Sequence, residues 1–343
     1  MKKKIYIRAD GSKEIGMGHL NRVFLLAHYL KRTRDIETIL ITKENESASR
    51  FLSSREINCF YIDSELSMVE EIQQLRYLSQ TLPLPSLVLL DVLDFDLQPD
   101  YIDALRTFQA PLVAITDDSD IRIIDADLII NGNPCQLDHD YSHCRGRYLV
   151  GPKYFIMDDG YASVEKIQYE GRVKKIFISV GGSDHNNILF NIIDTLEKFG
   201  GFELRIVSSN STGYLSRLKN TLKLISTKSE LLVDIPSLIN SWFGCDIAIT
   251  AGGNTLFERI AVGMPGCTIC QLVRQNEIAS RFENLGANVN LGLAKRLDKF
   301  QLEHDLYRFL LNKKNHILQY RLSGNVIDGN GLVRVADELC SLI

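Results

Sequence analysis

The segment Gly16-Met-Gly-His-Leu-Asn-Arg22 places a histidine and an arginine directly after two glycines. Gly16 and Gly18 carry no Cβ, so a ligand can approach the backbone closely there. His19 would stand at a helix N-terminus, where the helix dipole favours neutral imidazole, a proton acceptor for water or a hydroxyl group. The segment predicts a general base at His19, and the alternative is that His19 simply begins an amphipathic helix. Arg22, one turn later, is either an anion partner or a solvated charge.

A second glycine segment lies in the other half of the chain, between Asp246 and Glu258. A β-branched run at 247–250, two glycines and apolar residues at helical spacing predict a strand, a tight turn and a helix. Free backbone N–H groups at the start of such a helix suit phosphate oxygens, and a carboxylate one turn later can accept hydrogen bonds from ribose hydroxyls. The spacing favours a nucleoside diphosphate over a plain turn, with contacts from Gly252, Gly253, Asn254, Thr255 and Glu258.

Other polar residues follow predicted strands. Asp91 and Asp117 end two such strands, where they either touch a ligand or cap the following helices. A further turn is either a phosphate or sugar contact or a turn whose aspartate caps the next helix, and it consists of Gly181, Gly182, Ser183 and Asp184.

Two cysteine clusters resemble metal sites in composition alone. The first matches no zinc spacing and contains Cys135, His139, His143 and Cys144. In the second, Cys267 and Cys270 are three apart on a predicted strand and therefore face opposite sides. We expect neither a metal nor a cofactor.

Strands that alternate with helices along the chain must position these loops. The pattern predicts an α/β protein with two Rossmann-like, doubly wound domains facing a cleft. The loops after the strands at 5–8, 87–91, 175–180 and 247–250 should face it, because ligands bind beyond the carboxyl ends of parallel strands. An irregular tract at 132–172 predicts domains 1–160 and 161–343, with a last helix that can pack back on the first domain.

The composition is that of an ordinary globular protein. The 343 residues have a net charge of −4 and a pI near 6.0, which argues against a nucleic-acid surface. No stretch approaches the ~20 apolar residues of a membrane span. Seven scattered cysteines fit reduced thiols. We expect a cytoplasmic, monomeric protein that binds no nucleic acid and does not insert stably into a membrane.

Together, these motifs resemble those of the UDP-sugar hydrolases of pseudaminic-acid biosynthesis and their spore-coat-polysaccharide relatives, which are themselves similar to MurG-type GT-B glycosyltransferases. The matching segments span nearly the whole chain and are Arg8-Ala-Asp-Gly-Ser12, Ile15-Gly-Met-Gly-His-Leu-Asn-Arg22, Ile178-Ser-Val-Gly-Gly-Ser-Asp184, Ala251-Gly-Gly-Asn-Thr-Leu-Phe-Glu258, Gly263-Met-Pro265, Gln275-Asn276 and Asp328-Gly-Asn-Gly331. Two segments depart from the family pattern. Asp91-Val-Leu-Asp94 lacks the usual tyrosine, and Met157-Asp-Asp-Gly160 replaces an arginine-bearing segment.

The resemblance implies a GT-B fold that holds UDP in the C-terminal domain. It assigns the diphosphate to residues 252–255, the ribose to Glu258 and the role of general base to His19, and it implies no metal. His19 would activate water for inverting attack on the anomeric carbon of UDP-2,4-diacetamido-2,4,6-trideoxy-β-L-altropyranose. Further contacts to substrate or phosphate are expected from Asp10, Gly16, Gly18, Arg22, Gly181, Gly182, Ser183, Asp184, Gln275 and Asn276.

Two other functions fit the same motifs. A GT-B glycosyltransferase with a UDP-amino-sugar donor would use His19 to deprotonate an acceptor hydroxyl instead of water. A catalytically inactive relative would bind the nucleotide-sugar without turning it over. The sequence leaves these alternatives open.

Overall fold

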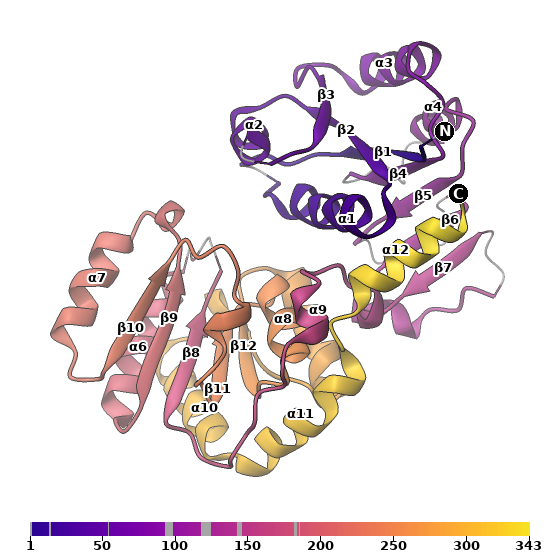
Figure 1. Ribbon diagram of the computed structural model, residues 1–343. Helices are drawn as coiled ribbons and strands as arrows, with labels where there is room; N and C mark the ends of the chain where they lie inside the picture. The colour runs from indigo at the N-terminus through magenta and orange to yellow at the C-terminus, as the bar shows by residue number, and fades with distance from the viewer. Residues whose placement is uncertain are drawn as a thin grey trace. The chain divides into compact units, whose positions relative to one another are not determined.

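The computed structural model describes the chain except for residues 1, 14, 54, 93–98, 118–124, 143–145, 182–183 and 185. The chain forms two compact units (Figure 1). The first combines Met1–Asp159 with Asn330–Ile343, and the second contains Gly160–Gly329. The predicted second domain, 161–343, thus includes a last stretch that the structure assigns to the first unit.

The first unit is built on a parallel sheet of seven strands in the order β3-β2-β1-β4-β5-β6-β7. Side chains alternate along a strand, so β1 turns Ile5 and Ile7 to one face of the sheet and Tyr6 and Arg8 to the other. The strands are β1 (Lys4–Ala9), β2 (Glu37–Lys43), β3 (Asn58–Ile62), β4 (Leu87–Asp91), β5 (Leu112–Ile115), β6 (Leu128–Asn131) and β7 (Arg147–Val150).

Helices cover both faces of this sheet. The core around Ile5 and Ile7 lies under α1 (Gly18–Arg34), α2 (Glu46–Ser53) and α12 (Gly331–Ser341). The core around Tyr6 lies under α3 (Met68–Thr81) and α4 (Pro99–Arg106). The yellow α12 packs beside the indigo α1 in Figure 1. Short 3₁₀ turns complete the unit at η2 (Pro134–Asp138) and η3 (Pro152–Tyr154).

The second unit repeats this plan with a parallel sheet of six strands, in the order β10-β9-β8-β11-β12-β13. These are β8 (Lys175–Ser179), β9 (Glu203–Ser208), β10 (Ser229–Val233), β11 (Ile247–Thr250), β12 (Gly266–Cys270) and β13 (Val289–Leu293). The helices are α5 (Gly160–Ser163), α6 (Ile188–Phe199), α7 (Leu215–Leu224), α8 (Asn254–Ala261), α9 (Val273–Asn284), α10 (Lys299–Leu311) and α11 (Lys313–Val326), with turns η4 (Asn210–Thr212), η5 (Ile239–Ser241) and η6 (Ala294–Arg296).

Both sheets run outward in two directions from their first strands, which confirms the prediction of an α/β chain with two doubly wound domains. Within the described residues, no helix combines the length and the apolar character that a membrane crossing requires.

Some elements escaped the sequence prediction. Helix α3 buries Glu71 and Leu75, so a charged residue occupies its inner face and hides the apolar period. Helix α9 begins at Val273, and its first residue and the preceding Leu272 are exposed, so they do not mark an apolar face from which the start could be read. Helix α4 and the strands β7 and β10 were also missed, and both strands are partly exposed sheet edges.

Candidate active site

The first candidate site lies where β1 and β4 run side by side. The chain winds from β1 outward through β2 and β3, and then from β4 in the opposite direction, so the loops after β1 and β4 separate. Doubly wound sheets bind ligands at such a topological switch point, beyond the carboxyl ends of the strands. His19 stands in the first turn of α1, which follows β1, and Asp91 is the last residue of β4.

His19 is paired with Asp91. Its Nδ1 lies 2.6 Å from Asp91 Oδ1, and the Asp91 side chain is completely buried whereas that of His19 is 12% exposed. Arg22 Nη2 also lies 3.1 Å from Nδ1, but it donates to Asp91 Oδ1 as well. An ionised carboxylate can only accept hydrogen bonds, so the tautomer that bonds to Asp91 carries its proton on Nδ1 and has Nε2 as an acceptor. A buried aspartate in this position orients the ring and stabilises the imidazolium that forms when Nε2 takes a proton. The sequence prediction of a general base rested on the helix dipole and did not include Asp91 as a partner of His19.

Arg22 supplies the positive charge that the buried Asp91 needs. Its Nε donates to Asp91 Oδ2 at 2.5 Å, and its Nη1 donates to both oxygens of Asp117, at 2.7 and 2.8 Å. Burial would lower the pKa of Arg22, but the two carboxylates outweigh burial and raise it. Arg22 therefore pairs with carboxylates of the protein itself.

The sequence interpretation did not connect Asp91 with His19. It left Asp91 between a ligand contact and a helix cap. The position of Asp91 could have indicated the pair. A carboxylate at the end of a fully buried strand needs a partner close by. The loop after the neighbouring strand β1 was the nearest source of one.

The other predicted residues of the first unit have separate roles. Asp10 accepts from both Nη atoms of Arg8 at 2.6 Å and from the backbone N–H of Lys43 at 2.8 Å, so the protein engages it. Gly16 has a φ of +81°, which a side chain would strain. Gly18 opens α1, and a Cβ there would meet nothing within 4 Å. The backbone at Gly18 is open to a ligand.

The second candidate site lies at the switch point of the second unit, between β8 and β11. Gly181 follows β8 with a φ of +87°. A Cβ at Gly252, after β11, would come within 2.8 Å of Cys270 Sγ and 2.9 Å of Gln275 Cβ, so packing requires this glycine. At Gly253, a Cβ would lie 3.7 Å from Gln275 Nε2, an ordinary contact. The protein would therefore tolerate a Cβ at Gly253, and packing does not explain this glycine.

The first backbone donors of helix α8 have no acceptor among the described residues. Its N-cap residue, Gly253, offers no side-chain cap. Within the described part of the chain, the N–H groups of Asn254 and Thr255 meet no acceptor. Phosphate oxygens can accept from such donors, and the positive end of the helix dipole favours them. Glu258 lies one turn further along and is half-buried.

Gln275 and Asn276, near the start of α9, differ in what they contact. Gln275 Oε1 accepts from the backbone N–H of Gln271 at 3.0 Å, and its Nε2 is close to Gly253. Asn276 Oδ1 accepts from Asn290 Nδ2 at 3.0 Å. The structure thus brings Gln275 to the turn at Gly253, whereas Asn276 joins α9 to β13.

Asp184 caps α6. Its Oδ1 and Oδ2 accept the N–H groups of Ile188 and Leu189, at 2.9 and 3.0 Å. This arrangement corresponds to the second of the two sequence interpretations of this turn. Gly182 and Ser183 lie outside the described residues.

Among the described residues, no group of three or more His, Cys, Asp or Glu side chains comes together in a way that could hold a metal ion. His143 and Cys144, two members of the cluster near Cys135, lie outside that part of the chain. Burial raises the pKa of Cys267 and of Cys270 to about 12, which leaves both thiols protonated and inert at neutral pH.

Comparison with known proteins reveals distant relatives. No protein-family model matches the chain. It is 25% identical over 353 residues to the spore coat polysaccharide biosynthesis protein SpsG of Bacillus subtilis, covering 98% of this chain and 97% of SpsG. It is also 25% identical over 288 residues to the uncharacterized protein MJ1062 of Methanocaldococcus jannaschii, covering 80% of this chain. The chain spans little more than half of that archaeal protein, 57% of its length.

Solved structures share the fold along the whole chain. MurG of Acinetobacter baumannii superposes with a TM-score of 0.72 at 13% identity, covering 99% of this chain and 100% of MurG. The calicheamicin glycosyltransferase CalG4 gives 0.66 at 14% identity, covering 100% and 98%. MnaA of S. aureus, solved with UDP, gives 0.62 at 15% identity, covering 99% and 98%. The chain has the GT-B fold, as predicted.

Proposed function

We propose that this chain hydrolyses a UDP-linked diacetamido-trideoxyhexose to free sugar and UDP. The reaction would serve the biosynthesis of a pseudaminic-type nonulosonic acid or of a surface polysaccharide. The observation that carries the proposal is the 2.6 Å pairing of His19 Nδ1 with the buried Asp91, which leaves Nε2 as a proton acceptor at a switch point. The substrate is a UDP-sugar, and the proposal needs neither metal nor cofactor.

In this reaction, His19 Nε2 takes a proton from water while the water oxygen attacks the anomeric carbon. Attack occurs opposite the leaving group, so the configuration inverts. The bond between the anomeric carbon and the phosphate oxygen breaks, and its electron pair stays on the β-phosphate of UDP. Asp91 stabilises the imidazolium, and Arg22 balances the charge of Asp91.

We propose that the second unit binds the UDP. Three features support a diphosphate site: the N–H groups of Asn254 and Thr255, which meet no acceptor among the described residues, the absence of a side chain at Gly253, and the nearby Nε2 of Gln275. These donors would stabilise the charge that gathers on the departing phosphate, and UDP is a stable anion that needs no strong general acid. Glu258 would accept hydrogen bonds from the ribose.

The relatives support nucleotide-sugar chemistry. SpsG of Bacillus subtilis is named for spore coat polysaccharide biosynthesis, and its match to this chain is nearly complete on both sides. The MnaA structure, which has the same fold, holds UDP.

The decisive experiment follows the oxygen atoms. The protein is incubated with UDP-2,4-diacetamido-2,4,6-trideoxy-β-L-altropyranose in heavy-oxygen water, without an acceptor, and the products are read by mass spectrometry. Water attack on the anomeric carbon puts the label in the free sugar and none in UDP. Label in UDP would mean attack at phosphorus. An intact donor in the presence of bound UDP would contradict hydrolysis of this sugar.

A matched pair of variants tests the role of His19. We expect His19→Ala to lower turnover by about 10² to 10⁴-fold, because a general base contributes on this order. Its UDP affinity, measured by calorimetry, should stay unchanged. The control is His28→Ala, an exposed residue on the same helix, which should keep full turnover. A parallel loss of turnover and UDP binding in His19→Ala would sink the assignment.

Glycosyl transfer is the second candidate, favoured by the shared fold with MurG and CalG4. In that reaction His19 would deprotonate an acceptor hydroxyl in place of water. Alcohols and sugars added to the same assay distinguish the two reactions. A transferase releases UDP faster with its acceptor and attaches the sugar to it, whereas a hydrolase yields free sugar at an unchanged rate.

We further propose that the protein acts as a cytoplasmic monomer. Light scattering after size-exclusion chromatography should then give a mass near 38.8 kDa. Fractionation of cells that produce the protein tests its location, and recovery in the membrane pellet would contradict the proposal.

A further inference from the structure

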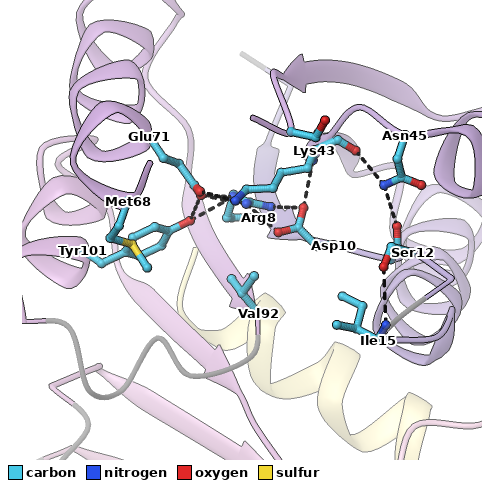
Figure 2. Close-up of a pocket in the computed structure, with 12 residues that line it drawn as sticks. Arg8, Asp10, Ser12, Ile15, Lys43, Asn45, Met68, Glu71, Val92 and Tyr101 are labelled. Carbon is cyan, nitrogen blue, oxygen red and sulfur yellow. Dashed lines mark hydrogen bonds and ion pairs between the residues drawn. The ribbon is translucent and has the colours of Figure 1, made fainter. Parts of the chain in front are cut away.

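A cavity of about 480 Å³ opens in the first unit beside the end of β1 (Figure 2). The loop between β1 and α1, the end of β2 and helix α3 contribute to its wall. Its volume falls within the ~300–1,000 Å³ of small-molecule sites. Of the described residues that line it, none belongs to the His19 and Asp91 pair, whereas Asp10, an expected substrate contact, does line it.

The floor of the cavity is a set of buried charges. Arg8, whose side chain is 1% exposed, donates to both oxygens of Asp10 at 2.6 Å and to Glu71 Oε1 at 2.7 Å. Tyr101 donates its hydroxyl to the same oxygen of Glu71. Figure 2 shows these side chains converging on Arg8. Each carboxylate on the floor therefore has a partner within the protein.

The floor has no net charge at neutral pH. Burial would raise the pKa values of Asp10 and Glu71, but the attraction of Arg8 outweighs burial and lowers both. Both carboxyl groups are therefore ionised, and they balance the positive charges of Arg8 and Lys43. An anion placed there would gain little from the two cations, because the two carboxylates repel it.

Lys43 still has hydrogen bonds to give. Its Nζ lies 3.1 Å from Glu71 Oε2, and its side chain is 30% exposed. An ammonium group carries three N–H bonds, and within the described residues Glu71 is its partner. The other N–H bonds suit an uncharged acceptor in the cavity, such as a hydroxyl or amide oxygen.

Apolar side chains complete the lining. Ile15 and Met68, each 42% exposed, and Val92 border the cavity in Figure 2. Covering such groups is favourable by ~25 cal/mol for each Å² removed from water. Methyl and acyl groups of a ligand would supply that cover.

We infer that this cavity binds a neutral, hydroxyl-bearing organic molecule with methyl or acyl groups. Its hydroxyl or amide oxygen accepts from Lys43 Nζ, and its apolar groups pack on Ile15, Met68 and Val92. A deoxygenated, N-acylated hexose belongs to this class, and a carboxylate or phosphate of similar size does not. The inference deepens the proposed function and rests on it where it names a hexose, because the sugar of the proposed donor belongs to this class; the preference for a neutral ligand rests on the lining alone.

A matched pair of sugars tests the class of ligand. 2-Acetamido-2,6-dideoxygalactose and 2-acetamido-2-deoxygalacturonic acid differ in carrying a methyl or a carboxylate group at the same carbon. In saturation-transfer NMR with the full chain, we expect transfer to the methyl and acetyl protons of the neutral sugar. The acid should bind at least about tenfold more weakly. Equal or tighter binding of the acid would overturn the inference.

Two variants of α3 locate the ligand. Met68→Trp narrows the cavity from its exposed border and leaves the buried floor intact, so we expect at least about tenfold weaker binding of the neutral sugar. Tyr77→Trp is the control, because Tyr77 is 63% exposed on the same helix and does not line the cavity. Unchanged sugar binding by Met68→Trp would place the ligand elsewhere and refute the inference.

Measurements with UDP separate this inference from the proposed function. Met68→Trp should bind UDP as the unchanged protein does. If its KM for the UDP-sugar donor rises, the cavity takes the sugar of the donor; if that KM stays constant, the cavity takes a separate molecule. Absence of donor hydrolysis by the unchanged protein would refute the hydrolase proposal and leave the sugar-binding result standing.

Discussion

The switch point of the first unit holds ion pairs, and the described part of the second switch point holds glycines and amides. Between β1 and β4, Asp91 is bound by both His19 and Arg22. Between β8 and β11, Gly253 and the amide of Gln275 lie beside a helix whose first backbone donors meet no acceptor in the described part of the chain. One fold thus presents a fixed proton acceptor at one sheet and, at the other, N–H donors that meet no acceptor among the described residues.

The difference shows how the two tasks place opposite demands on a loop. A general base must hold one lone pair in a set direction before the substrate arrives, so its neighbours are engaged by the protein. An anion brings its own negative charge and needs donors that the protein has not used. Of the two switch points, the one whose charges are engaged by the protein is therefore the candidate catalytic point, and the one whose described N–H donors meet no acceptor is the candidate anion site.

A substitution of Asp91 tests this comparison most directly. Asp91→Asn keeps the shape of the side chain but removes the acceptor that fixes the proton on His19 Nδ1. We expect turnover to fall by about 10³ to 10⁴-fold, with UDP affinity unchanged. Steady-state kinetics and calorimetry with UDP measure the two effects. Asp117→Asn, on the outer side of Arg22, should cost less than about tenfold, and near-normal turnover in Asp91→Asn would refute the role of the pair.

The stability of the two units should also respond differently to acidic pH. Burial lowers the pKa of His316, in the second unit, to about 4 from its ordinary value of 6.5. Between these values the unfolded chain binds a proton that the folded unit excludes. Stability is therefore full above pH 6.5 and falls as the pH drops towards 4, by up to about 3 kcal/mol. In the first unit, the pKa values of Asp10 and Glu71 are lowered. Their ionised carboxyl groups therefore stabilise this unit until the pH falls below about 4.5.

Hydrogen exchange along the chain measures this contrast. On going from about pH 7 to about pH 5, the second unit should lose protection before the first. His316→Gln should abolish that pH dependence, and His304→Gln, at a side chain that is 52% exposed, should leave it intact. Simultaneous loss of protection in both units would contradict the assignment to His316.

Substitutions of two neighbouring glycines test the second switch point, between β8 and β11. Gly253→Ala adds a Cβ that the protein tolerates but a phosphate does not, so UDP affinity should fall about tenfold without a change in melting temperature. Gly252→Ala forces the Cβ against Cys270 and Gln275 and should cost about 1–3 kcal/mol of stability. Calorimetry and thermal unfolding read the two effects. Normal UDP affinity in Gly253→Ala would place the diphosphate elsewhere.

The smallest effect is expected at the start of α9. Gln275→Ala removes one donor beside Gly253 and should weaken UDP binding by about 0.5–1.5 kcal/mol. Asn276→Ala loses its bond to Asn290 and should lower stability by about 1 kcal/mol while UDP affinity stays the same. Titrations of both variants with UDP test this order, and a larger loss of affinity in Asn276→Ala would reverse it.

The sequence predicts the fold well where one strand or loop carries the whole signal. The strand at 87–91 is buried throughout and apolar up to Leu90, and the glycine segments mark the turns after β1 and β11. Helix α3 was missed because its buried Glu71 looks like a surface residue until Arg8, 63 positions away, is placed beside it. Long-range compensation of charge cannot be read from local periodicity.

The candidate site shows the same limit. His19 was predicted from its own glycine loop, whereas Asp91 stands 72 residues away and shares no spacing with it. The order of the strands brings them together, since β1 and β4 are neighbours although β2 and β3 separate them in sequence. The predicted contacts to UDP at residues 252–255 and at Glu258 stay predictions that the variants above can test.

Helix α12 affects the order in which the two units can fold during translation. It completes the core around Ile5 and Ile7, and a Cβ on Gly331 would come within 2.0 Å of the Phe155 carbonyl oxygen, so the helix begins against the first unit. On the ribosome, Gly160–Gly329 emerges in full before this helix does. The second unit, although later in the chain, is therefore the first with a complete sequence, and the first unit waits with an open hydrophobic face until translation reaches α12.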